Sequence, residues 1–196
     1  MENGATLFDP SSIYFSFDTK VGQDVTIGPN VVFGPGVEIC DGVVIRAFCH
    51  IEGTEILSKA SIGPFARLRP GADIGESVHV GNFVEVKNST LAAGVKANHL
   101  SYIGDTKVGE KANIGAGTIT CNFDGYKKSM TEIGARAFIG SNTALVAPVK
   151  IGEDSIIGAG SVITKNIEDG ALAISRAKQK VGEKYIRKSN DAKVKK

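Results

Sequence analysis

Long apolar runs, a secretion signal and paired cysteines are all missing from this chain of 196 residues. No stretch is long and apolar enough to span a membrane, and the first 20 residues lack a basic segment followed by an apolar one. The three cysteines are odd in number and show no C-x-x-C spacing, which disfavours disulfides and a cysteine zinc site. These absences predict a single cytoplasmic domain with reduced thiols and no membrane contact.

Positive charge is concentrated at the C-terminal end. Between Arg176 and Lys196 there are nine Lys or Arg and two Asp or Glu, whereas residues 1–175 contain 14 basic and 19 acidic residues. Three interpretations of this basic tail are open: a solvated end, a segment that holds a phosphate-bearing ligand or a neighbouring subunit, or a nucleic-acid contact. The third is the weakest, because no aromatic or base-reading motif accompanies the charge, and we expect no nucleic-acid partner.

What the chain does contain is a six-residue repeat of aliphatic residues. It runs from Val21 to Ile51, from Ile56 to Val86 and from Ile133 to Ile163, with shorter runs between. Gly often follows the aliphatic residue. This spacing is too sparse for an amphipathic helix and too wide for one alternating strand, and it is typical of a hexapeptide-repeat parallel β-helix.

Three six-residue units make one triangular coil, so residues 18 apart lie above one another at the β-sheet spacing of about 4.8 Å. Residues 21–168 predict roughly eight such coils of an all-β triangular prism. A lead-in segment at residues 1–20 precedes them, and the basic tail at residues 169–196 follows. The period does not determine the handedness, but hexapeptide helices as a family are left-handed.

The largest interruption of the repeat lies between Thr120 and Ile133, where the sequence CNFDGYKKSMTE is polar and contains Asp-Gly. One interpretation is a tolerated surface insertion. Loops that interrupt a regular scaffold often carry function, and the flanking coils also contain unusual polar residues. We therefore favour a binding loop that presents Lys127 and Lys128.

The spacing of 18 residues also relates Arg69 to Lys87. Each follows an inward aliphatic residue directly, so the two cations are expected to stack on adjacent coils. Like charges in this arrangement repel each other unless an anion lies between them, and a phosphate group would serve. The alternative is two solvated side chains that point apart.

Ser141 and Ala159 are also 18 apart, and Arg176 follows about one coil later. They predict a groove that could take an elongated ligand with a terminal phosphate, although small residues are common at turns. His99 lies in an irregular stretch near Tyr102, where it is either structural or catalytic.

A zinc site is not expected. Some hexapeptide-helix enzymes resemble carbonic anhydrase and bind zinc through three histidines, two of them five residues apart on one coil. His50 and His79 lie in ordinary units of the repeat, and no pair of histidines has that spacing here.

In chain order the sequence contains IGPFARLRPGA, HVGNFVEVK, KANHLSYIGD, NIGAGTITCNFDG, IGSNTALVAPV and ALAISR. From about residue 21 to Arg176 the chain resembles, in order and spacing, the C-terminal domain of the bifunctional N-acetylglucosamine-1-phosphate uridyltransferase/glucosamine-1-phosphate N-acetyltransferase family. The resemblance implies acetyl transfer from acetyl-CoA to the 2-amino group of glucosamine 1-phosphate. The product would be N-acetylglucosamine 1-phosphate for UDP-N-acetylglucosamine, peptidoglycan and lipopolysaccharide synthesis. It also implies a homotrimer with the site between two helices.

The resemblance assigns roles to individual residues and requires no metal. It implies that His99 is the general base and that Asn122 orients the reacting groups. The implied ligands of the sugar phosphate are Arg69, Lys87, Tyr102, Asn113 and Lys128. The implied contacts of acetyl-CoA are Ala116, Phe123, Ser141, Ala159 and Arg176. A neutral imidazole can accept the proton of the attacking amine, and amide groups of the GAGT turn can stabilise the oxyanion.

The chain departs from the family pattern in three respects. Phe123 replaces the usual Tyr, so a hydroxyl is lost, and Asn98 stands where Gly is frequent. The sequence also contains no Gly-rich nucleotide loop, so we expect neither uridyl transfer nor its magnesium from this chain.

Two other functions stay open. The chain could acetylate a different amino sugar or nucleotide sugar, and the paired Arg69 and Lys87 favour a small phosphorylated acceptor. It could instead be a non-catalytic hexapeptide scaffold, which would bind no acetyl-CoA.

Overall fold

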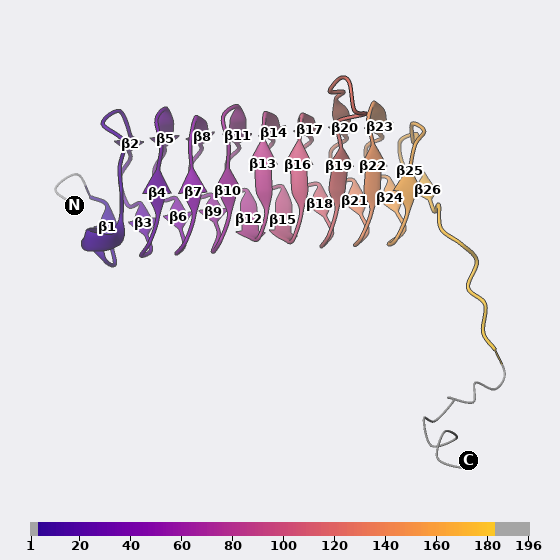
Figure 1. Cartoon of the computed structure of the whole chain (residues 1–196), viewed down its shortest axis with the longest axis horizontal. Helices are drawn as coiled ribbons and strands as arrows, with labels where there is room; N and C mark the ends of the chain where they lie inside the picture. Colours follow the sequence, from indigo (N-terminus) through magenta and orange to yellow (C-terminus); the bar gives the residue numbers. More distant parts are fainter. Residues whose placement is uncertain (1–3, 183–196) are drawn as a thin grey trace, which may run out of the picture.

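The computed structural model describes residues 4–182 and has the expected architecture, a left-handed parallel β-helix of about nine turns. Short strands stack into three parallel sheets, named A, B and C here, which form the faces of a straight triangular prism (Figure 1). Each strand pairs with the strand one coil further along the chain. Among the described residues no helix is long and apolar enough to cross a membrane.

The strands are two to four residues long. Sheet A contains β1 (Thr6–Leu7), β3 (Thr26–Ile27), β6 (Val44–Ile45), β9 (Ser61–Ile62), β12 (His79–Asn82), β15 (Lys96–His99), β18 (Asn113–Ile114), β21 (Phe138–Ile139), β24 (Ile156–Ile157) and β26 (Leu172–Ala173). Sheet B contains β4 (Val32–Phe33), β7 (His50–Ile51), β10 (Arg67–Leu68), β13 (Glu85–Lys87), β16 (Tyr102–Gly104), β19 (Ile119–Cys121), β22 (Ala144–Val146) and β25 (Val162–Ile163). Sheet C contains β2 (Lys20–Val21), β5 (Val37–Ile39), β8 (Thr54–Ile56), β11 (Ala72–Ile74), β14 (Ser89–Leu91), β17 (Thr106–Val108), β20 (Thr131–Ile133) and β23 (Val149–Ile151). One short 3-10 helix, η1, spans Pro10–Ser12.

The parallel pairing extends past both limits that the repeat predicts. Near the N-terminus β1 pairs with β3, and Tyr14 forms a bridge with Val32, so part of the expected lead-in at residues 1–20 belongs to the first coil. Near the C-terminus β26 pairs with β24, so the prism continues past residue 168. The basic tail from residue 183 onward lies outside the described residues.

The interior of the prism is a stack of aliphatic side chains in register. Ile27, Ile45 and Ile62 follow one another on adjacent coils of sheet A and are almost completely buried. Each such side chain stabilises the fold by about 2 kcal/mol relative to an exposed one. In the middle coils the interior becomes more polar, and Thr120 takes an aliphatic position of the repeat, where its hydroxyl accepts a hydrogen bond of 2.8 Å from the Gly104 N–H. A polar residue at an aliphatic position indicates that hydrophobic packing is not its only role there.

Each corner of the prism carries a column of residues with positive φ. We name the corners AB, BC and CA after the sheets they join. The AB column is Asn30, Phe48, Phe65, Phe83, Leu100, Gly117, Asn142 and Gly160. The BC column is Gly36, Gly53, Gly71, Asn88 and Asp105, and the CA column is Asp24, Gly42, Lys59, Ser77, Gly94, Lys111, Arg136, Asp154 and Gly170. This backbone region costs a non-glycine residue about 1 kcal/mol, so large side chains in these columns need a reason.

All interruptions of the repeat fall at the BC corner. The runs that end at Ile51, Val86 and Ile103 each resume five residues later instead of six, and the long insertion after Thr120 joins β19 to β20 at the same corner. Where a residue is missing, neighbours on adjacent coils are 17 apart, as Asn82 and His99 are. The regular AB and CA corners therefore keep the prism straight, while the BC corner varies.

Candidate active site

Arg69 and Lys87 stack on adjacent coils, as the spacing predicts. The pairing of β10 with β13 places Leu68 beside Val86, and each cation is the next residue along its chain. Their charges are not unbalanced, however. Arg69 Nη1 is 2.9 Å from Glu85 Oε1, and Lys87 Nζ is 3.2 Å from Asp105 Oδ1. In the chain itself a carboxylate balances each cation, so their stacking does not by itself require a bound phosphate.

Asp105 is the centre of this group. It is only 6% exposed, and its carboxylate accepts hydrogen bonds from Lys87, from Asn88 at 2.5 Å and from Asn122. Burial by itself raises the pKa of Asp105, but the hydrogen bonds from these three side chains outweigh it and lower the pKa below the usual range of an aspartate. The carboxylate therefore stays ionised beneath the surface.

The insertion after Thr120 is a small hairpin that projects from the prism beside β20 (Figure 1). Phe123 pairs with Lys128 across it, and Asp124 Oδ1 accepts hydrogen bonds from the backbone N–H groups of Tyr126 and Lys127 at 2.9 and 2.8 Å. These bonds fix the turn of the hairpin. The predicted binding loop is therefore an ordered element.

The hairpin brings Lys128 to the cation group. The amino group of Lys128 approaches that of Lys87, and because both groups are cationic the proximity of Lys87 lowers the pKa of Lys128. The charge of Arg69 lowers the pKa of Lys128 further, whereas Asp105 acts in the opposite direction. Three cations thus converge, and an anionic ligand bound between them would favour the charged form of Lys128.

Tyr102 and Asn122 complete this group, which we call the BC cluster: Arg69, Glu85, Lys87, Asn88, Tyr102, Asp105, Asn122 and Lys128. Asn122 is 8% exposed, and its Nδ2 lies 3.5 Å from the Tyr102 hydroxyl oxygen. A Cβ at Gly104 would overlap the Tyr102 ring, so glycine at that position makes room for the tyrosine. Five residues implied for the acceptor sugar and the reacting groups are therefore neighbours in one chain.

His99 is the last residue of β15 in sheet A and lies at the AB corner, across sheet B from the BC cluster. Its side chain is exposed, and its Nδ1 is 3.1 Å from Oδ1 of Asn82 on the previous coil. An amide oxygen can only accept, so Nδ1 carries the proton and Nε2 keeps a free lone pair. This is the tautomer that a general base needs at Nε2.

The expected acetyl-CoA contacts follow His99 in a column along the prism. The Gly117 N–H donates to the His99 carbonyl, the Asn142 N–H to the Ala116 carbonyl at 2.7 Å, and the Gly160 N–H to the Ser141 carbonyl at 2.8 Å. Arg176 Nη1 then donates to the Ala159 carbonyl at 2.6 Å. The column, in order, is His99, Ala116, Ser141, Ala159 and Arg176. Its length from His99 to Ala159 is three coil spacings, about 14 Å.

Two expected residues lie apart from both groups. Asn113 pairs with Lys96 and Phe138 on the face of sheet A, away from the BC cluster. Phe123 is 59% exposed on the hairpin, and none of the described contacts joins it to the column. Within one chain the geometry thus gathers ten of the twelve expected residues into two groups at the two edges of sheet B.

The sequence reasoning missed Asn82, Glu85, Asn88 and Asp105. The spacing of 18 residues that relates Arg69 to Lys87 also relates Lys87 to Asp105. Counting 18 residues on from Lys87 would therefore have identified the carboxylate. Asn82 is 17 residues before His99, and it would have been found by counting across the missing residue at the BC corner. Among residues 4–182 no three His, Cys, Asp or Glu side chains are grouped to hold a metal ion.

Comparison with known proteins agrees with this architecture. Residues 18–53 and 130–165 match the family model for bacterial transferase hexapeptide (six repeats). The repeat and the three parallel sheets together define a hexapeptide-repeat β-helix protein.

More specifically, the chain is homologous to curated proteins named bifunctional protein GlmU. The relative from Paramagnetospirillum magneticum is 63% identical over 179 residues, which is 91% of this chain and 40% of the relative. The relative from Sphingopyxis alaskensis is 60% identical and that from Zymomonas mobilis 54% identical, each over 196 residues, which is 100% of this chain and 44% of the relative. The chain corresponds to their C-terminal part and spans about two fifths of their length.

Solved structures show the same fold. PerB from Caulobacter crescentus, crystallised with CoA and GDP-perosamine, has 27% sequence identity and a TM-score of 0.54, and the match covers 59% of this chain and 54% of PerB. The acyltransferase LpxA from Moraxella catarrhalis has 18% identity and a TM-score of 0.53 over 87% of this chain and 69% of its own. The second likeness concerns the fold alone.

Proposed function

We propose that this protein transfers the acetyl group of acetyl-CoA to the 2-amino group of glucosamine 1-phosphate. The observation that carries the proposal is the pairing of two groups on the edges of one sheet. One is a column with a histidine base at its start and an arginine at its end, and the other is a cluster of three cations around a buried carboxylate. The identity of 54–63% to GlmU proteins supports this choice over other acyl transfers.

The proposed role of His99 follows from its tautomer. Asn82 holds the protonated Nδ1, so Nε2 accepts a proton from the acceptor amine as its nitrogen attacks the thioester carbon. A carbon–nitrogen bond forms, the carbon–sulfur bond breaks, and the imidazolium returns the proton to the departing thiolate. No oxidant or additional reactant is needed.

The column after His99 supports binding of an extended acyl-CoA. The N–H groups of Ala116, Ser141 and Ala159 donate to no backbone carbonyl among residues 4–182, so they are available to amide oxygens of a pantetheine arm or to the oxyanion. Arg176, at the end of the column, supplies a cation for a terminal phosphate. CoA bound to the structurally similar PerB supports the same cosubstrate here.

We propose that the BC cluster binds the phosphate of the sugar. Arg69, Lys87 and Lys128 present cationic groups on one side of the prism, and only Lys87 has a buried partner. A phosphate dianion can accept hydrogen bonds from all three, which Glu85 and Asp105 cannot do together. A monophosphorylated amino sugar fits this charge better than a neutral one.

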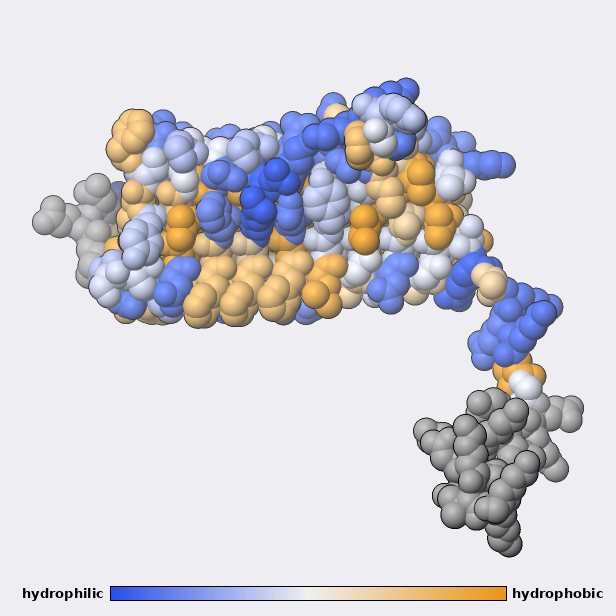
Figure 2. All heavy atoms as spheres, viewed as in Figure 1, coloured by the Kyte–Doolittle hydropathy of each residue, from blue (hydrophilic) through white to orange (hydrophobic). Residues whose placement is uncertain are grey.

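We further propose that the protein is a homotrimer. Phe48, Phe65, Phe83 and Leu100 form an apolar column at the AB corner, and each is 45–62% exposed although its backbone has positive φ. The ring centroids of Phe48 and Phe65 are 4.8 Å apart, and those of Phe65 and Phe83 are 5.2 Å apart. Figure 2 shows a row of hydrophobic residues along the lower edge of the prism. A rotation axis parallel to the prism axis places each coil of one copy beside the same coil of a second copy. Each apolar side chain of the column then faces the column of the neighbouring copy at the same level.

A second copy would also complete the active site. Leu100 follows His99 directly, so whatever covers the apolar column also closes over the base, which lies on an open surface in one chain. Replacing Phe65 and Phe83 by Ser should give monomers in sedimentation experiments and reduce turnover. A double variant that stays trimeric, or a wild-type protein that is monomeric at micromolar concentration, contradicts this arrangement.

The test of the main proposal is release of free thiol from acetyl-CoA in the presence of glucosamine 1-phosphate. We expect CoA release that depends on both substrates. A panel with glucosamine 6-phosphate and amino sugars linked to nucleotides distinguishes the second candidate, which PerB and its bound GDP-perosamine suggest. Failure to bind acetyl-CoA at all, measured by calorimetry on the folded protein, would leave only the scaffold.

A further inference from the structure

The BC corner does not require an acidic side chain for its turn. Gly36, Gly53 and Gly71 occupy the same column with positive φ on earlier coils, and at Asp105 the column has instead an aspartate with φ of 49°. An ionised carboxylate that is 6% exposed is costly unless every lone pair is used. The fold would be served by glycine, so the carboxylate has another role.

The contacts of Asp105 divide by oxygen atom. Oδ1 accepts from Asn88 Nδ2 at 2.5 Å and from Lys87 Nζ at 3.2 Å. Oδ2 accepts from Asn122 Nδ2 and from Lys87 Nζ at 3.4 Å. A carboxylate only accepts, so Asn122 must turn its amino group toward Asp105 and its carbonyl oxygen away from it.

The orientation of Asn122 determines what it can do to a substrate. No side chain or backbone group among residues 4–182 donates a hydrogen bond to Asn122 Oδ1. In this orientation the oxygen of Asn122 can accept a hydrogen bond from an N–H of the acceptor amine. That bond directs the lone pair of the amine nitrogen toward the thioester carbon. In the flipped orientation Nδ2 would face the amine, and two donors would oppose each other.

We propose that Asp105 is a positioning residue for acetyl transfer, which fixes the carboxamide of Asn122 with its oxygen toward the acceptor amine. The inference rests on the proposed function and concerns a residue that the sequence comparison with the acetyltransferase family did not assign. Asp105 touches neither substrate. It acts through Asn122.

The test uses Asp105→Gly, because glycine is the residue that the same column carries at three earlier corners. The matched control is Asp154→Gly. Asp154 also has positive φ and accepts from a cation 18 residues earlier, Arg136, at 2.7 Å, but it lies exposed in the CA column, which contains glycine at Gly42, Gly94 and Gly170. Both variants therefore remove a carboxylate and an ion pair from a corner that tolerates glycine.

We expect Asp105→Gly to lower kcat about 30- to 100-fold, with the KM for acetyl-CoA unchanged, and Asp154→Gly to match the wild type. Calorimetry with inorganic phosphate supplies the second readout. Removing a negative charge from beside Lys87 should leave phosphate binding as tight or tighter, whereas a collapsed site would bind it more weakly. A fall in kcat without loss of phosphate affinity is the signature of positioning.

Other outcomes overturn the inference. Wild-type kcat in Asp105→Gly shows that Asn122 is oriented without the carboxylate, and weaker phosphate binding together with a higher KM for acetyl-CoA shows a merely structural role. If the wild type releases CoA only with another acceptor, the proposed substrate is wrong and the same variants are compared with that acceptor. If it releases CoA with none, both proposals fail.

Discussion

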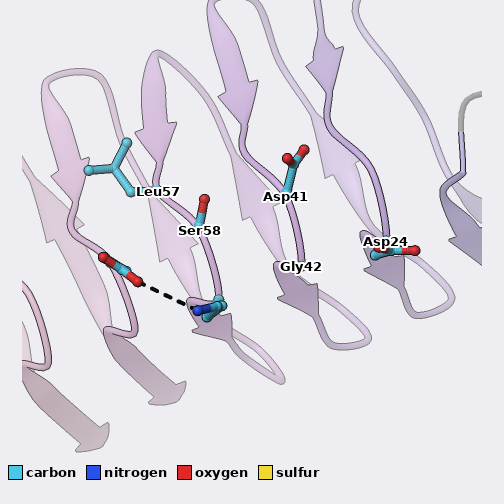
Figure 3. Close-up of a pocket in the computed structure, with 7 residues that line it drawn as sticks. Asp24, Asp41, Gly42, Leu57 and Ser58 are labelled. Carbon is cyan, nitrogen blue, oxygen red and sulfur yellow. Dashed lines mark ion pairs between the residues drawn. The ribbon is translucent and has the colours of Figure 1, made fainter.

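Two corners of the prism are rich in charge, and they differ in how the charges are packed. At the CA corner a hollow of about 510 Å³ is lined by Asp24, Asp41, Gly42, Leu57, Ser58, Lys59 and Glu76 (Figure 3). The dashed ion pair in that view joins Lys59 Nζ to Glu76 Oε1 at 3.9 Å, with side chains 73% and 58% exposed. At the BC corner Lys87 and Asp105 are 3.2 Å apart, with side chains 17% and 8% exposed.

The difference in exposure between the two ion pairs distinguishes a solvated surface at the CA corner from a candidate site at the BC corner. An exposed ion pair at 3.9 Å, such as that of Lys59 with Glu76, contributes about 0–1 kcal/mol. A buried pair is costly to form and persists only when hydrogen bonds complete it, as Asn88 and Asn122 do for Asp105. The charges that are buried and mutually dependent surround Asp105 at the BC corner and do not line the hollow at the CA corner.

The largest expected effect concerns His99. His99→Ala should lower kcat about 10²- to 10⁴-fold while acetyl-CoA still binds, because the proton acceptor is lost but the column remains. His79→Ala is the control, since His79 lies exposed on a regular strand of the same sheet. Steady-state kinetics and calorimetry check both variants. Unchanged turnover in His99→Ala would remove the histidine from the mechanism.

The second largest effect is expected on replacing Lys87 at the BC corner, with Lys59 at the CA corner as the comparison. Lys87→Ala should raise the KM for glucosamine 1-phosphate about 10- to 100-fold and cost about 2–3 kcal/mol of unfolding free energy, because it leaves the buried Asp105 without its cation. Lys59→Ala should change neither quantity measurably. Kinetics and urea denaturation provide the numbers. Equal stability losses in both variants would contradict the distinction between the corners.

The sequence predicted the frame of this molecule better than its chemistry. The repeat determines the sheets, the register and the stacking of Arg69 on Lys87, because one aliphatic residue per unit can pack only at the centre of a triangular coil. Ten residues of the two groups were anticipated, their roles through family resemblance, whereas Glu85, Asn88 and Asp105 were not. Spacing by itself could not show that Asp105 is buried and ionised, because burial depends on how the inserted hairpin folds back over the corner.

Acid should abolish the contribution of Asp105 before it unfolds the rest. The folded pKa of Asp105 lies below its unfolded value of about 3.9, so its stabilisation is fully present above that pH and is lost as pH falls through the lowered pKa. The difference in unfolding free energy between wild type and Asp105→Gly should be constant from about pH 5 to 8 and shrink below about pH 4. Urea titrations at several pH values measure it, and a difference that stays constant down to pH 2 would mean that folding leaves the pKa of Asp105 unchanged.

A smaller effect is proton uptake on phosphate binding. The pKa of Lys128 is lowered because the cationic side chain of Lys87 lies close to it, and a bound phosphate would favour the charged form of Lys128 again. Binding should therefore take up a fraction of a proton that grows as the pH rises toward the lowered pKa of Lys128. Calorimetry in two buffers of different ionisation enthalpy detects this fraction. Lys128→Met should abolish it, and uptake that persists in that variant would place the titrating group elsewhere.

The smallest effect is expected at the CA corner itself. Glu76→Gln removes a charge from the hollow in Figure 3 but breaks only an exposed pair, so the unfolding free energy should change by less than about 0.5 kcal/mol. Turnover and both KM values should stay at wild-type levels, because neither substrate group proposed here contacts that corner. A loss of activity in Glu76→Gln, with folding intact, would mean that exposure is a poor guide to function in this prism. The CA hollow would then have to be treated as a second binding site on the same grounds as the BC cluster.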